Sequence, residues 1–336
     1  MVKMNKQLGI AGLALAGLLI CMLFIAGCTS TTGGAPSQAT TAPTSAATPV
    51  ATTAVSTPAA TGTSQPATTA PATTANATSS GSGTIKVTGS TTVLPIAQAA
   101  ADAFLKLNPD DNIQVSGGGS GVGVQSIGEK TVDIGMSSRE VTAAEMAKYP
   151  DFVITPVSLD GLSIIVNSAN NPVNSLTLSQ LKDIYNGTIT NWKDVGGKDM
   201  AIVVIGRDSA SGSRQFFTDS VMKGENYVST MFEKNSNGAI EQSVGQTPGA
   251  IGYTGLGFND PTIRQLKIDV NGTLIAPSVA TVLDKSYPLS RYLYMITNGQ
   301  PTGLTKDYIN FILSPDGQKI VADQGFVPLP NATPLK

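Results

Sequence analysis

A sharp change in composition at Thr84 determines which part of this chain can fold. No charged residue lies between Lys6 and Lys86, and residues 29–83 are almost entirely Thr, Ala, Pro, Ser and Gly. Such a stretch cannot bury enough apolar surface to offset the entropy lost on ordering. We therefore predict a disordered linker over residues 29–83 and a folded part over residues 84–336.

The first 28 residues have the pattern of an export signal of the lipoprotein type. Lys3 and Lys6 precede an apolar run that ends in Ile25-Ala-Gly-Cys28. A basic start, an apolar stretch and a small-residue cleavage site are typical of secretory signals. Cys after Ala-Gly resembles a lipobox, in which Cys28 is lipidated. The alternative is an uncleaved anchor, because the run reaches the roughly 17–25 residues that a membrane span needs. Both interpretations predict a protein at the cell surface or in the periplasm, anchored to the outer side of the cytoplasmic membrane.

Two absences restrict the chemistry. The chain has no His, and its two Cys, Cys21 and Cys28, lie in the N-terminal segment. Residues 84–336 therefore hold no Ser-His-Asp triad, no disulfide, no zinc-thiolate site and no cysteine nucleophile. With 21 basic and 23 acidic residues and a net charge of −2, the chain also lacks the basic excess of nucleic-acid-binding proteins. We expect no metal, no cofactor and no nucleic-acid partner.

Strand and helix patterns alternate along the folded part, which favours an α/β fold. The predicted strands are 84–88, 113–115, 132–134, 162–166, 202–205, 250–253 and 293–296. The predicted helices are 93–107, 178–185, 214–221, 305–313 and 316–324. Two further helices are predicted: one of about eight residues that ends at 130, and one that starts near Thr142, where Thr142 and Glu145 fit a capping box.

Four strand-to-helix junctions carry hydroxyl groups and glycines. They are Ser90/Thr91/Thr92, Ser120/Gly121, Ser137/Ser138 and Ser211/Gly212/Ser213. A helix start has free N–H groups and a partial positive charge, so it suits an anion. Arg139 and Arg207 lie beside two of these junctions and can supply forked donors to a tetrahedral oxyanion.

Each junction also has a purely structural interpretation. Ser or Thr before a helix is most often an N-cap, and Asp208 could hold Arg207 in a structural ion pair. No Gly-Lys-Ser/Thr follows the glycine-rich run 117–121, so it does not resemble a Walker loop.

The order and spacing of several motifs resemble the phosphate-binding protein of the high-affinity phosphate ABC importer. The matching stretches are 88–95, 118–121, 132–140, 176–181 with 184–187 and 190–192, 206–213, 249–253 and 287–291. The resemblance implies a two-lobed periplasmic-binding-protein type II fold with the ligand cleft between the lobes. Lobe one would comprise about 84–160 plus about 256–336, and lobe two about 161–255.

The resemblance also implies the ligands of the anion. They are Ser90, Thr91, Thr92, Ser120, Ser138, Arg207, Ser211, Gly212 and Ser213. Some relatives have Asp where this chain has Ser138, and that Asp accepts the proton of hydrogen phosphate. Selectivity for phosphate over sulfate is therefore open, and Arg139 is an added candidate ligand.

The expected function is capture of inorganic phosphate by a membrane-tethered monomer and delivery to the permease and ATPase subunits of an ABC importer. The alternatives are another tetrahedral oxyanion, such as sulfate, molybdate or tungstate, or sensing or adhesion in place of transport. An enzyme that uses Ser211 as nucleophile is not expected, because no His or Cys is available to activate it.

Overall fold

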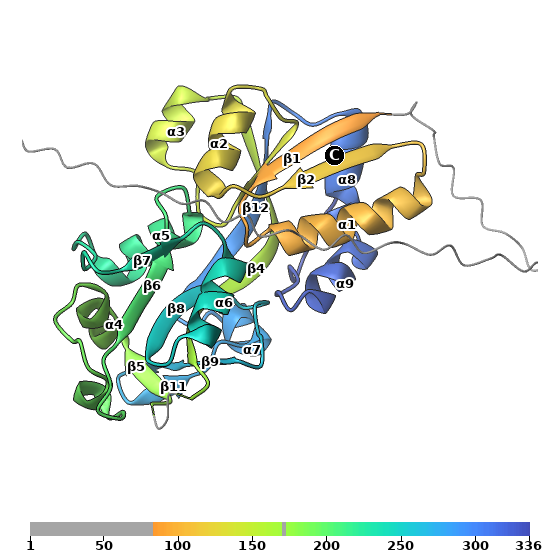
Figure 1. Cartoon of the computed structure of the whole chain (residues 1–336). Helices are drawn as coiled ribbons and strands as arrows, with labels where there is room; N and C mark the ends of the chain where they lie inside the picture. Colours follow the sequence, from red (N-terminus) through yellow and green to blue (C-terminus); the bar gives the residue numbers. More distant parts are fainter. Residues whose placement is uncertain (1–82, 170–172) are drawn as a thin grey trace, which may run out of the picture. The chain divides into compact units, whose positions relative to one another are not determined.

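The computed structural model describes residues 83–169 and 173–336 (Figure 1). The predicted signal segment, the lipidation at Cys28 and nearly all of the predicted linker lie outside the described residues. Within the described ranges, no helix combines the length and the apolar character needed to span a bilayer.

The first part of the fold is three parallel strands with helices between them. The strands are β1 (Thr84–Gly89), β2 (Asn112–Ser116) and β3 (Ile134–Ser137), and β1 pairs with both others. The helices are α1 (Leu94–Leu107), α2 (Ser120–Gly128) and α3 (Ala143–Lys148). The predicted capping box of α3 is present, because Thr142 and Glu145 exchange side-chain-to-backbone hydrogen bonds.

Two long antiparallel strands cross the middle of the fold. β4 (Phe152–Asn167) pairs with β12 (Ser290–Asn298) along its first half and with β8 (Ala250–Gly255) from Leu162 to Val166. The strand order of the main sheet is β2-β1-β3-β12-β4-β8-β6-β7, and β9 also pairs with β4. Figure 1 shows β4 and β12 running between the part with α1–α3 and the part with α4–α7.

The remaining strands and helices complete the second part and the C-terminus. The strands are β5 (Ser175–Thr177), β6 (Val203–Arg207), β7 (Phe232–Lys234), β9 (Ile263–Gln265), β10 (Lys267–Val270) and β11 (Thr273–Ile275). The helices are α4 (Leu178–Tyr185), α5 (Gly212–Phe217), which continues as a π-helix over Thr218–Met222, α6 (Asn237–Gln246), α7 (Val279–Leu283), α8 (Gly303–Leu313) and α9 (Pro315–Asp323). A 3₁₀-helix spans Trp192–Val195.

Two large apolar clusters divide the described residues. We call the elements packed around the first cluster lobe one; it includes Val87 of β1, Ile96 and Phe104 of α1, and Tyr308 of α8. Lobe two surrounds the second cluster, which includes Ile164, Trp192 and Tyr253.

The stretch 263–289 lies with lobe two, although the sequence assigned it to lobe one. β9 pairs with β4, β10 pairs with β5, and Val282 and Tyr287 join the second cluster. The chain therefore returns to lobe one through β12, near residue 290, and not near residue 256.

Several elements differ from the sequence prediction. β3 begins at Ile134 and not at Val132, and β4 is 16 residues long where only 162–166 was predicted. Pro156 and several polar residues in the first half of β4 obscured the strand pattern. α6 was not predicted, because its sequence NGAIEQSVGQ contains two glycines and few strong helix formers.

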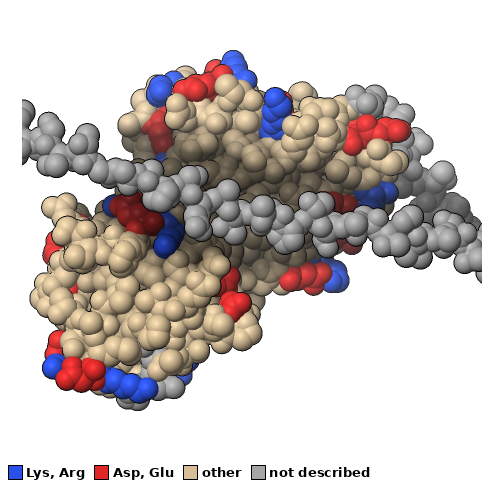
Figure 2. Space-filling model, in the orientation of Figure 1, with Lys and Arg blue, Asp and Glu red and all other residues tan. Residues whose placement is uncertain are grey.

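Charged side chains are scattered over the face seen in Figure 2. Lys and Arg lie beside Asp and Glu there, and most of the visible described surface carries neither. This face has no continuous basic patch of the kind that a nucleic-acid backbone would need.

Candidate functional site

The helix starts of lobe one and lobe two meet in a buried polar cluster. α1 follows the turn after β1, α2 begins at Ser120, and α5 begins at Gly212. The buried polar side chains at these junctions are Ser90, Thr91, Thr92, Ser120, Ser138, Arg207, Ser211 and Ser213. We call this set, together with Gly212, the junction cluster. Its members were predicted from the sequence.

Short contacts join several members of the cluster, both within a lobe and between the lobes. Ser120 Oγ lies 3.3 Å from Ser138 Oγ and accepts a hydrogen bond of 3.0 Å from Ser138 N. Thr92 Oγ1 lies 3.3 Å from Ser213 Oγ, although the two residues are 121 positions apart in the sequence. A hydrogen bond of 2.9 Å from Gly121 N to Ala210 O also joins the lobes.

Gly212 allows a close approach of the two lobes. A side-chain Cβ at this position would collide with Ser120 Oγ and would lie 3.0 Å from Ser138 Oγ. The backbone of α5 therefore faces the two hydroxyl groups of lobe one directly. A glycine at a helix start also leaves room for an anion to approach the free N–H groups.

Two of the predicted serines also act as caps. Ser211 Oγ accepts from Arg214 N at 3.2 Å and is the N-cap of α5. Ser90 Oγ accepts from Thr92 N at 3.2 Å and from Val93 N at 3.4 Å. Each hydroxyl still has a proton to donate, so capping and anion binding are compatible.

Arg207 brings a buried positive charge to the end of β6. Its side chain donates from Nε to Lys234 O and from Nη2 to Asn235 O, both at 3.1 Å. Within residues 83–169 and 173–336, no carboxylate forms an ion pair with Arg207, and Nη1 has no hydrogen-bond partner. Burial lowers the pKa of Arg207, while the nearby Tyr253 and Asp208 act to raise it.

The cation at Arg207 is therefore held by neutral carbonyl groups and not by an acid. The residue is only 1% exposed, and an uncompensated charge at such a depth is costly. α5 begins at Gly212, five residues after Arg207, and a helix start favours negative charge as well.

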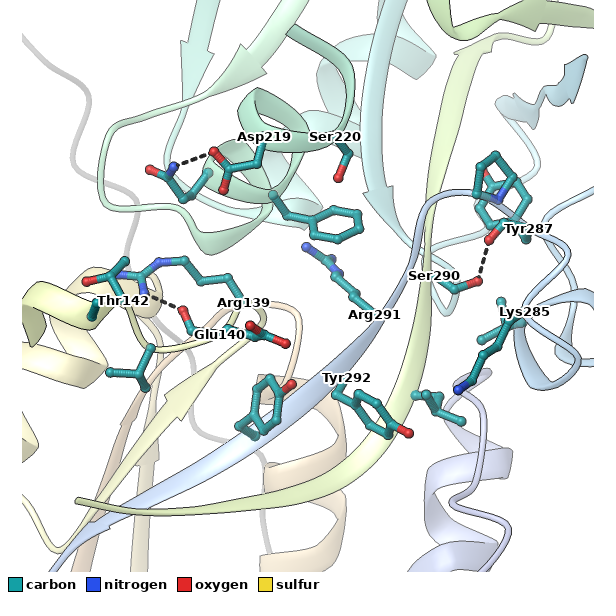
Figure 3. A pocket seen from close by; sticks show the side chains of 18 residues that line it. Arg139, Glu140, Thr142, Asp219, Ser220, Lys285, Tyr287, Ser290, Arg291 and Tyr292 are labelled. Atoms are coloured by element: carbon teal, nitrogen blue, oxygen red, sulfur yellow. Dashed lines mark hydrogen bonds between the residues drawn. The ribbon is translucent and has the colours of Figure 1, made fainter. Parts of the chain in front are cut away.

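Arg139 does not join the junction cluster. Its Nη2 donates to Glu145 Oε1 at 2.7 Å, and its Nη1 donates to Glu145 Oε2 and to Glu140 O at 2.8 Å. The side chain lines a separate cavity of about 720 Å³, which Phe216 and Arg291 also line. The Arg291 guanidinium carbon lies 5.4 Å from the centre of the Phe216 ring, and Figure 3 shows Arg139 and Arg291 as separate side chains that line this cavity. The donors of Arg139 are thus committed to its own lobe.

A residue that the sequence did not single out lies against the cluster. Asn237 is the first residue of α6, is fully buried, and donates from Nδ2 to Thr91 Oγ1 and Thr92 Oγ1. The preceding residues 234 and 235 supply the carbonyls that hold Arg207. The available signal was Ser236 followed by Asn-Gly, since Ser236 caps α6 through Ala239 N.

A buried ion pair connects the crossing strands next to the cluster. Arg291 of β12 donates from Nε and Nη2 to Asp160 Oδ2 of β4, at 2.9 and 2.7 Å. Asp160 Oδ1 accepts from Leu256 N at 2.8 Å. Burial raises the pKa of Asp160, and the charge of Arg291 opposes this shift. The pair holds β4 at the point where it leaves β12 and joins β8.

Comparison with known proteins places this chain in a family. The PBP superfamily domain matches residues 30–316. Phosphate-binding protein PstS of Bacillus subtilis is 34% identical over 250 residues, which cover 74% of this chain and 81% of that protein. Phosphate-binding protein PstS of Staphylococcus saprophyticus is 35% identical over 266 residues, which cover 75% of this chain and 82% of that protein.

Solved structures agree with the sequence relatives. A protein from Clostridium perfringens, described as a phosphate ABC transporter substrate-binding protein with bound phosphate, is 33% identical with a TM-score of 0.68. The match covers 73% of this chain and 99% of that one. An ABC-type phosphate transport receptor from Vibrio cholerae is 30% identical with a TM-score of 0.61, and the match covers 73% of this chain and 100% of that one.

The chain is thus a member of the PBP superfamily. Within that superfamily it belongs to the family of phosphate-binding proteins PstS. The family resemblance predicted from the sequence is confirmed, and so is the α/β periplasmic-binding-protein type II fold.

Proposed function

We propose that this protein captures inorganic phosphate outside the cytoplasmic membrane and delivers it to an ABC importer. The observation that carries the proposal is the buried Arg207 guanidinium without a carboxylate partner among the described residues, at the end of the strand that precedes the Ser211-Gly212-Ser213 helix start. The names of the relatives, which are phosphate-binding proteins, support phosphate as the anion.

The proposed ligands are the junction cluster of both lobes. They are Ser90, Thr91, Thr92, Ser120, Ser138, Arg207, Ser211, Gly212 and Ser213. Arg139 is left out, because Glu145 and Glu140 occupy its donors. Each hydrogen bond to a charged oxygen contributes about 1.5–3 kcal/mol net, and micromolar affinity needs about −8 kcal/mol, so several such bonds suffice.

Binding would require the lobes to separate and close. Ser120 and Thr92 are 0% and 1% exposed, so an anion cannot reach them while the lobes are in contact. The crossing strands β4 and β12 join the lobes and supply the region about which they would move. Contacts such as Thr92–Ser213 then form on closure, so that both lobes hold the anion.

The membrane tether and the assembly state belong to the same proposal. The Ile25-Ala-Gly-Cys28 pattern supports a lipid anchor at Cys28, and residues 29–83 would be the flexible connection. We propose a monomer that hands phosphate to permease and ATPase subunits and has no catalytic activity. An uncleaved N-terminal anchor, or phosphate sensing in place of transport, remains the alternative for these features.

Calorimetric titration tests the choice of anion. Phosphate, sulfate, molybdate and tungstate would be titrated separately into the full chain at neutral pH. The proposal expects the tightest binding for phosphate. Tighter binding of another of these anions would assign the site to that anion.

A further inference from the structure

Asn237 spans the boundary between the lobes at the junction cluster. Its Nδ2 donates to Thr92 Oγ1 at 2.9 Å and to Thr91 Oγ1 at 3.1 Å, and the residue is fully buried. The threonines lie at the start of α1 in lobe one, 145 and 146 positions away in the sequence. One amide group therefore connects α6 with two proposed ligands of the anion.

This contact determines the direction in which the threonine hydroxyls donate. An amide NH₂ group can only donate, so both Oγ1 atoms must accept from it. Thr92 Oγ1 also lies 3.3 Å from Ser213 Oγ, and if Ser213 donates in that contact, the protons of both threonine hydroxyls remain available for another acceptor. In a cluster that holds an oxyanion, that acceptor is a ligand oxygen, and each threonine becomes a donor to the ligand.

The other polar atom of the Asn237 amide, Oδ1, is a hydrogen-bond acceptor. Asn237 Oδ1 is buried and has no hydrogen-bond partner within the described ranges. A carbonyl oxygen only accepts, whereas Arg207 and the helix-start N–H groups only donate. Asn237 Oδ1 is thus a buried acceptor without a donor, and no carboxylate belongs to the proposed ligand set.

A monoprotonated oxyanion matches this combination. Hydrogen phosphate brings several acceptor oxygens and one O–H donor, while sulfate at neutral pH brings acceptors only. We propose that Asn237 is a specificity-determining residue. Its Nδ2 sets Thr91 and Thr92 as donors to the anion, and its Oδ1 accepts the proton of hydrogen phosphate. This inference rests on the proposed phosphate function.

The test compares two anions across four variants of the full chain. Inorganic phosphate and sulfate would each be titrated calorimetrically into wild type, Asn237→Ala, Asn237→Asp, Asp208→Asn and Asn235→Ala, with a thermal melt of each. Asn235→Ala is the matched control, because its side chain is exposed and its backbone carbonyl still holds Arg207. Asp208→Asn tests a rival acceptor, since Asp208 Oδ1 is also buried without a partner in the described part of the chain.

The two substitutions at Asn237 should change selectivity in different directions. Asn237→Ala should weaken phosphate binding by about tenfold to a hundredfold and sulfate binding by less, because only phosphate loses an acceptor for its proton. Asn237→Asp can no longer donate to the threonines and adds a negative charge, so both affinities should fall. In Asn237→Asp the affinity for sulfate should fall more than the affinity for phosphate, because sulfate has no proton to share with the carboxylate.

Several results would overturn the inference. Equal losses for the two anions in Asn237→Ala would make Asn237 a structural bridge only. A selectivity that collapses in Asp208→Asn and persists in Asn237→Ala would assign the acceptor to Asp208. If Asn237→Ala does not fold, the phosphate-to-sulfate ratio of Asn237→Asp decides, and a fall in that ratio refutes the inference. Wild type that binds no phosphate would instead refute the proposed function itself.

Discussion

Arg207 and Asp208 are adjacent in the sequence, yet they do not form an ion pair. The Arg207 guanidinium donates to the carbonyls of Lys234 and Asn235, while Asp208 uses its backbone groups to bond with Lys234 and Ser211. The buried positive charge is therefore positioned by neutral groups. A neutral support holds the guanidinium in place without cancelling the charge that attracts an anion.

The close approach at Gly212 predicts a specific effect of adding one methyl group. Gly212→Ala should weaken phosphate binding by about 1–3 kcal/mol, the usual cost of overpacking, because the methyl group meets Ser120 Oγ when the lobes are in contact. Calorimetric titration measures the change.

Gly238→Ala is the control, since nothing lies within 4 Å of a Cβ there. It should leave affinity unchanged and add up to about 1 kcal/mol of stability to α6. Unchanged affinity in Gly212→Ala would mean that the lobes do not close this tightly around the ligand.

The buried pair of Asp160 and Arg291 predicts non-additive effects on stability. Asp160→Ala leaves the Arg291 guanidinium buried without its partner and should lower the free energy of unfolding by about 3–5 kcal/mol. The double variant Asp160→Leu/Arg291→Met removes both charges and should lose less than the two single variants Asp160→Leu and Arg291→Met lose together. Denaturant titration of wild type and the four variants measures these differences. Additive losses would show that the pair is not energetically coupled.

The contact between Arg139 and Glu145 predicts a dependence of stability on pH. Partial burial acts to raise the pKa of Glu145, but hydrogen bonds from Arg139 and Thr142 and the charge of Arg139 lower it below the ordinary 4.5. A lowered carboxyl pKa contributes stability above the unfolded value, and that contribution is lost as the pH falls through the folded value. Glu145→Gln should therefore be less stable than wild type near pH 7 and should approach the stability of wild type as the pH falls below 4.5 and through the folded pKa.

Denaturant titrations of both proteins between about pH 7 and pH 3 would follow this difference. Arg139→Gln should reproduce the profile of Glu145→Gln while leaving phosphate affinity unchanged. A large loss of phosphate affinity in Arg139→Gln would return Arg139 to the ligand set.

The junction cluster was predictable because it is built from local patterns. Ser120 and Ser211 each stand where a strand pattern gives way to a helix, and Arg207 directly follows the apolar run of β6. Such positions can be located from residues that are neighbours in the sequence. Their meeting in one cluster followed from the family resemblance and not from the patterns themselves.

Asn237 and Arg139 show where sequence reasoning fails. Asn237 contacts threonines about 145 positions away and begins a helix of weak propensity, so no local signal connected it with the site. Arg139 lies beside the Ser137/Ser138 junction, but its guanidinium donates to Glu145, which belongs to the capping box of α3. The box was recognised in the sequence, yet a second role for its glutamate, six residues beyond Arg139, was not.

The N-terminal segments carry two predictions of their own. Residues 29–83 contain no charge and few core-forming side chains, so a chain that begins at Ser82 should fold and bind phosphate with the affinity of the full chain. Cys28→Ser should remain unprocessed or be released, as followed by membrane fractionation. Loss of binding in the shortened chain would contradict the linker assignment. A processed, membrane-bound Cys28→Ser protein would contradict the lipid anchor.

The most direct measurement is phosphate affinity with and without the Arg207 guanidinium. Arg207→Ala should weaken phosphate binding by about 2–5 kcal/mol, the range for truncating one partner of a buried charge pair, while the ligand-free protein stays folded. Arg207→Lys should recover only part of the loss, because an ammonium group cannot donate as a fork. Calorimetric titration and thermal melts of the three proteins report affinity and stability separately. If Arg207→Ala melts at a much lower temperature but binds phosphate as tightly as wild type, Arg207 is a structural residue and the proposed site is wrong.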